Sequence, residues 1–164
     1  MVQAALQPVS PVVDVITDTA LLDQTVEEVL GLMMGVPVTV SDNPLAPTNI
    51  TLTAVIGLAG ALSGAFTVVV NEAAAKQITA CMMGMQITEL DDTVLDGLGE
   101  ITNILAGAWK QKIPQLCAAC LLSVPTVVTG THYDIHRKTS TFRLTRSYRF
   151  NESTLTVSLY GEQP

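Results

Sequence analysis

Apolar residues recur at intervals of three and four near the start of the chain, which is the pattern of an amphipathic helix. Four residues carry it: Leu22, Val26, Val29 and Met33. Thr17 and Asp18 are suitable caps for the start of this helix, and Gly35 followed by Pro37 would end it. We therefore predict a helix from Thr17 or Asp18 to Gly35, and a proline-containing loop over 41–48.

The stretch from Ile50 to Val70 carries no charge and is long enough to cross a bilayer. Four hydroxyl residues interrupt it: Thr51, Thr53, Ser63 and Thr67. No Lys or Arg flanks the stretch to set an orientation, and its glycines suit a hairpin bend. These features favour two buried antiparallel strands, over 50–57 and 62–70, rather than a membrane-spanning segment.

Helix-like and strand-like segments follow in the second half. An Ala-rich helix is predicted over 72–83 with Asn71 as its cap, and a longer helix begins at Asp91 or Asp92 and reaches about Lys112. Three strands are predicted near 121–131, 142–150 and 154–160, the last two joined by a hairpin turn. This order predicts an α+β domain, an antiparallel sheet with helices packed on one face, built from two related halves.

The composition fits one globular domain. The chain has 164 residues, of which 48% are apolar and 14% charged, so it can bury one sizeable core and is not typical of disorder. Pro8 and Pro11 lie among small and polar residues near the start. We therefore expect an extended N-terminal arm over 1–12 and a single domain over 13–164.

The charge distribution argues against nucleic acid as a partner. The net charge is −7, and all eight Lys and Arg residues lie at or beyond Lys76. Five of them fall between Arg137 and Arg149, in an alternating segment that a solvated sheet face explains better than a binding patch.

Metal or redox chemistry receives little support. Cys117 and Cys120 have the C-x-x-C spacing, but they precede an apolar strand and no second pair completes a zinc site, so small core or loop residues are the favoured interpretation. The three cysteines cannot all pair and no secretory signal precedes them, which favours the cytoplasm. His132, Asp134 and His136 alternate on one strand face, where an exposed surface is favoured over a metal site.

The predicted helix over 91–112 has unusual residues in the stretch LDGLGEITNILAG, residues 95–107. Four positions form a stripe opposite its apolar arc, and we call this stripe the ridge: Asp96, Glu100, Asn103 and Gly107. Glycine costs about 1 kcal/mol relative to alanine in a helix interior, so a merely solvated face would not favour it. We interpret Gly97, Gly99 and Gly107 as removing bulk so that a partner can approach the helix.

The polar residues of the ridge suit positioning rather than acid-base chemistry. The Asn103 carboxamide has donor and acceptor atoms and can orient a water molecule. A carboxylate at Glu100, one turn away, can pair with a lysine of a partner. An amide that orients the attacking water is an established device in phosphoryl transfer.

The motif Asp96-x-x-x-Glu100-x-x-Asn103, with Ser123-Val124-Pro125-Thr126-Val127-Val128 further on, resembles the signature of the CheC/CheX/FliY phosphatases of bacterial chemotaxis. The CheX branch is the most similar, and the resemblance extends over most of the chain. It implies a CheC-like fold with pseudo-two-fold related halves. It also implies hydrolysis of the aspartyl phosphate on a CheY-like response regulator.

The resemblance implies a role for each ridge residue. Glu100 would contact the active-site lysine of the regulator, and Asn103 would enter the acyl-phosphate site and position water for in-line attack. Asp96 would support the helix or contact the partner, and Gly99 and Gly107 are expected in the partner contact. The chain would need no cofactor of its own, because the regulator supplies Mg²⁺.

One site per chain and a homodimer are also expected from the resemblance. Some relatives carry the E-x-x-N motif in both halves, but here Glu27 is followed three residues later by Leu30, and Glu28 by Gly31. The first predicted helix therefore lacks the motif.

Two alternatives remain open. The ridge could serve a non-enzymatic adaptor that binds a receiver domain or a flagellar-switch or receptor-array component. The same chemistry could also act on a receiver domain outside chemotaxis. Loss of Asn103 separates an adaptor from a phosphatase, because only the phosphatase needs the amide for turnover.

Overall fold

The secondary structure follows the capping and alternation signals of the sequence. The computed structural model describes residues 11–43, 50–131, 133, 136 and 140–162. Its helices are α1 (Pro11–Ile16), α2 (Thr19–Met34), α3 (Glu72–Met83), α4 (Asp92–Gln111) and α5 (Pro114–Cys117). Its strands are β1 (Val38–Ser41), β2 (Thr51–Gly60), β3 (Ser63–Asn71), β4 (Cys120–Leu122), β5 (Thr126–Gly130), β6 (Phe142–Phe150) and β7 (Ser153–Glu162).

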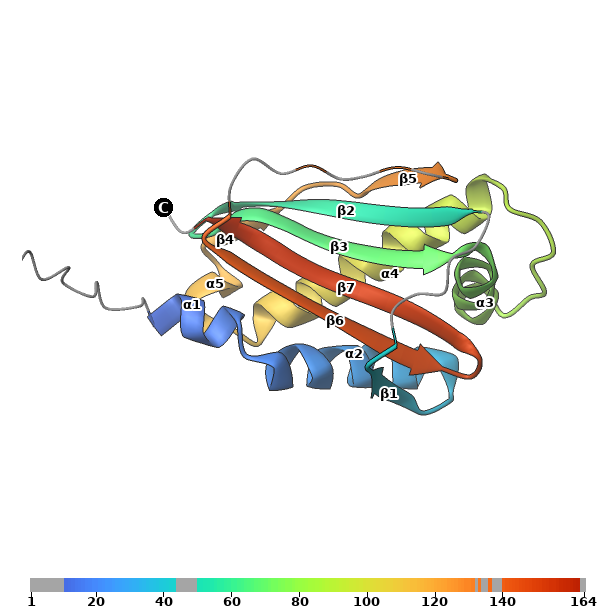
Figure 1. Cartoon of the computed structure of the whole chain (residues 1–164), viewed down its shortest axis with the longest axis horizontal. Helices are drawn as coiled ribbons and strands as arrows, with labels where there is room; N and C mark the ends of the chain where they lie inside the picture. The colour runs from blue at the N-terminus through green and yellow to red at the C-terminus, as the bar shows by residue number, and fades with distance from the viewer. Residues whose placement is uncertain (1–10, 44–49, 132, 134–135, 137–139, 163–164) are drawn as a thin grey trace, which may run out of the picture.

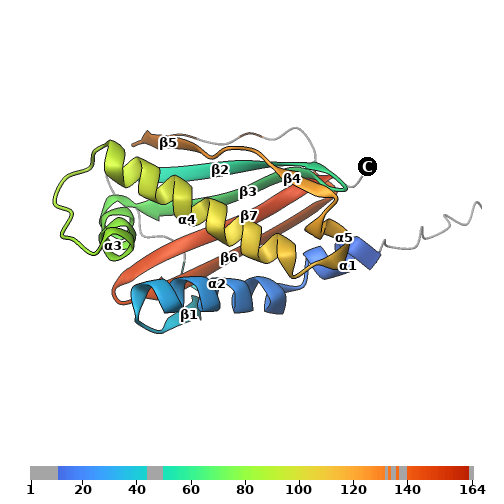
Figure 2. The ribbon, with the colours of Figure 1, turned by 180° about the vertical axis from the view of Figure 1, so that it is seen from behind.

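In the described part of the chain, seven strands form one antiparallel sheet in the order β1-β6-β7-β3-β2, with β4 and β5 both on the outer edge of β2. β4 pairs with residues 58–60 of β2 and β5 with residues 51–55, so the two short strands share one edge. The three long helices α2, α3 and α4 lie on the same face of this sheet (Figures 1 and 2). The predicted α+β fold is confirmed.

The two halves of the chain are related in topology. Each half is a helix followed by three strands: α2 with β1, β2 and β3, and α4 with β5, β6 and β7. β1 pairs with β6 as β5 pairs with β2, and the two hairpins β2–β3 and β6–β7 meet at the pair β3–β7. The pairing of these six strands is unchanged when the halves are exchanged, which is the expected pseudo-two-fold arrangement, and β4, paired with β2, has no counterpart among the described residues of the first half.

The core lies between the sheet and the helices. Alternate residues of β2 face it, and register places Ile56 opposite Phe66 of β3, both fully buried. Trp109 of α4 is also fully buried, with its ring centroid 6.0 Å from that of Phe66. Most of the core is aliphatic, and Trp109 and Phe66 are among its largest fully buried side chains.

Helix ends agree with the predicted caps. Asp18 accepts from the backbone N–H of Ala20, and Asn71 from that of Ala74, so both side chains cap helices. Gly35 ends α2 in the left-handed conformation with φ of 64°. The uncharged stretch Ile50–Val70 forms the β2–β3 hairpin as predicted, and no helix among the described residues is long and apolar enough to cross a membrane.

Some elements differ from the predictions. α1 begins at Pro11, so residues 11 and 12 are helical rather than part of an extended arm; residues 1–10 lie outside the described part of the chain. β1 follows Pro37 where no strand was predicted. The single strand predicted near 121–131 is divided into β4 and β5, because residues 123–125 leave the regular ladder between them.

A polar cluster fastens α2 to the sheet. Asp23 of α2 accepts from Arg146 Nη2 at 2.6 Å, from Arg146 Nε at 3.0 Å and from the Tyr148 hydroxyl at 2.8 Å. Burial raises the pKa of Asp23, but the hydrogen bonds from Arg146 and Tyr148 and the Arg146 charge outweigh it and hold the pKa below its ordinary value. Burial and the neighbouring Asp23 carboxylate raise the pKa of Tyr148, which keeps its hydroxyl a donor.

The cluster predicts a pH-dependent loss of stability. Asp23→Ala should lower the free energy of unfolding by about 2 kcal/mol at pH 7, because it leaves the buried Tyr148 hydroxyl and the Arg146 guanidinium without their acceptor. A carboxyl whose native pKa is depressed stabilises fully above its unfolded pKa, about 3.9, and loses that contribution as pH falls through the native pKa.

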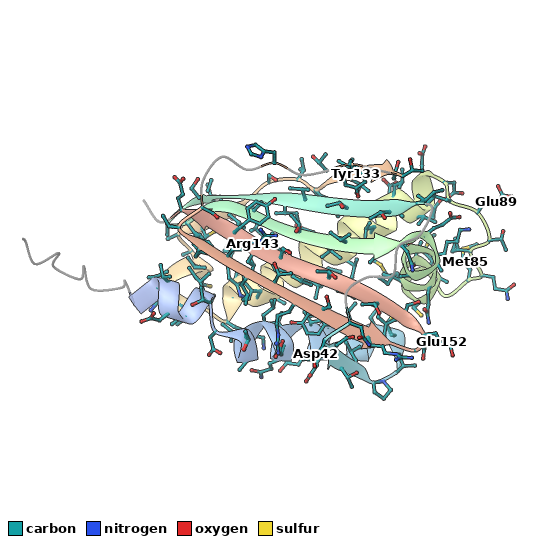
Figure 3. The ribbon with its side chains drawn as sticks, in the orientation of Figure 1. Asp42, Met85, Glu89, Tyr133, Arg143 and Glu152 are labelled. Atoms are coloured by element: carbon teal, nitrogen blue, oxygen red, sulfur yellow. The ribbon has the colours of Figure 1, made fainter. Side chains whose placement is uncertain are left out.

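The free energy of unfolding of wild type and Asp23→Ala can be measured by urea denaturation at pH 7 and below pH 4. The difference between the two proteins should narrow in acid, whereas a difference independent of pH would contradict the charged cluster. Asp42→Ala, at an exposed aspartate (Figure 3), is the matched control and should change stability little at either pH.

Candidate active site

Helix α4 presents the ridge on its outer face. Asp91 caps the helix by accepting from the backbone N–H groups of Thr93 and Val94, at 3.0 and 3.3 Å. The predicted apolar arc faces the core and is fully buried: Val94, Leu98, Ile101, Leu105 and Trp109. The ridge lies opposite this arc on the helix, so it is on the side of α4 away from the core.

The polar ridge residues are exposed. Asp96, Glu100 and Asn103 are all open to solvent. Within the described residues, no hydrogen bond or ion pair engages their side chains. Glu100 and Asn103 lie one turn apart, about 4.5 Å along the axis, so both can reach one site on a partner. The structure thus leaves a carboxylate and a carboxamide free for an external ligand.

Of the three glycines on or beside the ridge, Gly97 and Gly99 serve contacts inside the chain. A methyl group added at Gly97 would overlap the Oγ1 atom of Thr79 on α3 and lie 3.0 Å from its Cγ2 atom. Thr79 is fully buried, so it has little room to move. Gly97 therefore allows α3 and α4 to pack closely, which differs from the expectation that it clears space for a partner.

Gly99 lies against the sheet edge on the other side of α4. A methyl group there would sit 3.3 Å from Cγ of Pro125 and 3.7 Å from Cγ2 of Val127. Gly99 is buried against Pro125, whereas a residue that touches a partner was expected at the surface. Gly107 alone of the three meets nothing within 4 Å and remains an open position on the ridge.

The segment between β4 and β5 is held firmly beside α4. Ser123 donates its backbone N–H to the Gly57 carbonyl at 2.9 Å, and its Oγ accepts from the Gly57 N–H at 2.8 Å. The same Oγ donates to the Val124 carbonyl at 2.9 Å. The two bonds between Ser123 and Gly57 join residues 66 positions apart, so periodicity along the sequence could not reveal them.

The equivalent helix of the first half is engaged differently. Glu28 on α2 lies 2.6 Å from Lys112, which follows α4, and 2.7 Å from Gln24 of its own helix. The hydrogen bonds from Lys112 and Gln24 lower the pKa of Glu28, although its desolvation acts in the opposite direction. The Glu28 carboxylate is therefore already engaged within the chain.

The weaker candidates gather no site in the described residues. His132 and Asp134 lie outside the described part of the chain, and His136 is exposed. Tyr133, beside β5 (Figure 3), makes a 2.5 Å hydroxyl contact with Thr53. Cys117 ends α5 and is exposed, whereas Cys120 is buried at the start of β4, where burial raises its pKa. No group of three or more metal-ligating side chains occurs among the described residues.

The same type of substitution, glycine to alanine, should have opposite effects on stability at two positions of α4. Gly97→Ala should lower the free energy of unfolding by about 1–2 kcal/mol, because the overlap with Thr79 exceeds the gain in helix propensity. Gly107→Ala should raise it by up to about 1 kcal/mol, because the added methyl group meets nothing. Thermal and urea denaturation of both variants measure the effects; stabilisation by Gly97→Ala would contradict the close packing of α3 and α4.

Known proteins match this chain in sequence and in fold. The family model for the chemotaxis phosphatase CheX matches residues 52–145. The CheY-P phosphatase CheX of Thermotoga maritima is 34% identical over 110 residues, which cover 65% of this chain and 69% of that protein.

Two solved structures share the fold. The chemotaxis protein CheX of Vibrio vulnificus superposes with a TM-score of 0.74 at 20% identity, over 93% of this chain and 99% of that one. The CheX chain in the CheX-CheY-BeF₃-Mg²⁺ complex of Borrelia burgdorferi gives 0.72 at 16% identity, over 88% and 97%. Since the family model matches more than half of the sequence, this chain belongs to the CheX family of chemotaxis phosphatases.

Proposed function

We propose that this protein dephosphorylates the aspartyl phosphate of a CheY-like response regulator in chemotaxis or a related two-component pathway. The observation that carries the proposal is the pair Glu100 and Asn103, exposed one turn apart on the outer face of α4. The activity named for the Thermotoga maritima relative, and the complex formed by the Borrelia burgdorferi CheX, support the choice of reaction and partner.

Glu100 is the docking residue in this proposal. Its carboxylate pairs with the lysine near the regulator's phosphorylated aspartate, in a charge-assisted hydrogen bond. No described residue of this chain competes for that carboxylate, in contrast to Glu28 on α2, which Lys112 occupies. The pair fixes the position of α4 along the regulator, and so the position of the next turn.

Asn103 is the catalytic residue. With Glu100 paired, the carboxamide enters the acyl-phosphate site, where its oxygen accepts from a water molecule and its amino group donates to a neighbouring oxygen. The oriented water attacks phosphorus in line, the bond from phosphorus to the aspartate oxygen breaks, and inorganic phosphate and a free carboxylate result. An amide suffices because catalysis of phosphoryl transfer is mainly positioning and charge stabilisation.

The remaining ridge positions complete the contact. Gly107 leaves open space one turn beyond Asn103, and Asp96 adds a second exposed carboxylate one turn before Glu100. Gly99 contributes by admitting Pro125 beside the ridge. Mg²⁺ comes with the regulator, where it compensates the phosphate charge, so the ridge needs only neutral and acidic side chains.

Removal of the Asn103 carboxamide tests the proposal. The decay of acyl phosphate on a purified CheY-type receiver domain with Mg²⁺ should accelerate with wild type. Asn103→Ala should lower kcat about 100-fold with little change in KM, and Glu100→Gln should raise KM about tenfold. Gln111→Ala, which removes an exposed carboxamide about 12 Å further along α4, should keep wild-type kinetics.

Each contrary outcome has a definite meaning. If wild type and Asn103→Ala bind the receiver and neither changes the decay, the ridge belongs to a non-enzymatic adaptor. If neither binds, the substrate is a different receiver domain. Equal acceleration by both proteins would remove the catalytic role of Asn103.

A homodimer is proposed as the solution state. The three long helices share one face of the sheet, so in the part of the chain that the structure describes none of them covers the other face, which offers a surface for a second copy (Figure 1). Light scattering at micromolar concentration should then give twice the chain mass of 17.4 kDa, and a mass of one chain would contradict the dimer.

A further inference from the structure

The ridge alone is too small to hold a folded partner. Its exposed side chains come from a few positions on one helix, whereas specific interfaces bury about 800 Å² on each partner. A docked globular domain of about 100 residues has a radius of gyration near 13 Å, so it also covers what lies beside α4. The contact must therefore extend from the ridge to a neighbouring element.

Val124 is the most exposed large apolar residue on the element beside the ridge. Its side chain is 82% exposed, between β4 and β5 on the outer edge of β2. Single exposed apolar residues are common on protein surfaces, so exposure alone does not indicate a contact. Two further features of Val124 indicate a contact: its backbone is fixed, and it lies beside the ridge.

The backbone at Val124 is fixed from both sides. Ser123 before it is bound to Gly57 through its backbone N–H and its Oγ, and that Oγ also holds the Val124 carbonyl. Pro125 after it has a constrained φ angle and lies against Gly99. Because the backbone is already fixed, covering the Val124 side chain costs little backbone entropy, which favours binding.

Val124 lies next to the candidate active site. Pro125 lies over Gly99, which directly precedes Glu100 and is one turn before Asn103. The Cα atom of Val124 is about 3.8 Å from that of Pro125. A regulator that places its phosphorylated site on Asn103 therefore extends over this segment.

We infer that Val124 is a positioning residue for the response regulator, forming an apolar contact beside the ridge that orients the docked domain. The inference rests on the proposed function. Glu100 supplies the charged contact and Val124 the apolar one. The regulator is then held at two separate points beside Asn103. Binding strength and substrate choice then depend on the apolar residue that the regulator presents to Val124.

Steady-state kinetics of Val124→Ser on the phosphorylated receiver domain test this inference. We expect KM to rise about tenfold with kcat at saturation within twofold of wild type, since the variant removes docking and not chemistry. Val40→Ser is the matched control, because Val40 is 37% exposed on β1, at the opposite edge of the sheet. It should leave KM unchanged.

The outcomes separate this inference from the proposed function. An active wild type with equal KM for Val124→Ser and Val40→Ser would overturn the role of Val124 and leave the phosphatase intact. An equal rise of KM in both variants would also overturn it, because the effect would then be general. If wild type does not accelerate the decay at all, the proposed function fails first. Thermal unfolding of Val124→Ser should match wild type, since the residue is exposed.

Discussion

Close packing of the α4 backbone against its two neighbours is the constraint on which the candidate site depends. Gly97 admits Thr79 of α3 on one side of the helix, and Gly99 admits Pro125 on the other. With both flanks in contact and the apolar arc in the core, α4 cannot rotate about its axis without overlap. The polar ridge must then face solvent, and Glu100 and Asn103 are oriented before any partner arrives.

The two halves share a topology but use the polar residues of their long helices differently. Helix α2 uses two of its acidic residues within the chain: Asp23 holds Arg146 and Tyr148 of β6, and Glu28 holds Lys112. Helix α4 leaves the polar residues of the ridge, Asp96, Glu100 and Asn103, exposed and without a partner among the described residues. One half therefore uses these carboxylates in internal ion pairs, and the other leaves the ridge exposed for the proposed contact with the regulator. This division agrees with a motif that occurs once in the chain.

Local signals predicted much of this fold, and contacts between distant residues account for what was missed. The caps Asp18, Asn71 and Asp91 act within a few residues, so helix starts could be inferred from sequence. The break between β4 and β5 could not, because it depends on Ser123 meeting Gly57. Helical periodicity placed Glu100 and Asn103 on one ridge, but the internal roles of Gly97 and Gly99 required their partners to be known.

The structure of the complex with a BeF₃⁻- and Mg²⁺-bound regulator would test the account most directly, since it shows where α4 sits before hydrolysis. We expect Asn103 within about 3 Å of the attacking water or the phosphate mimic, and Glu100 within about 3 Å of a regulator lysine. A complex in which the ridge faces solvent, and the regulator contacts the sheet or α2 instead, would contradict it.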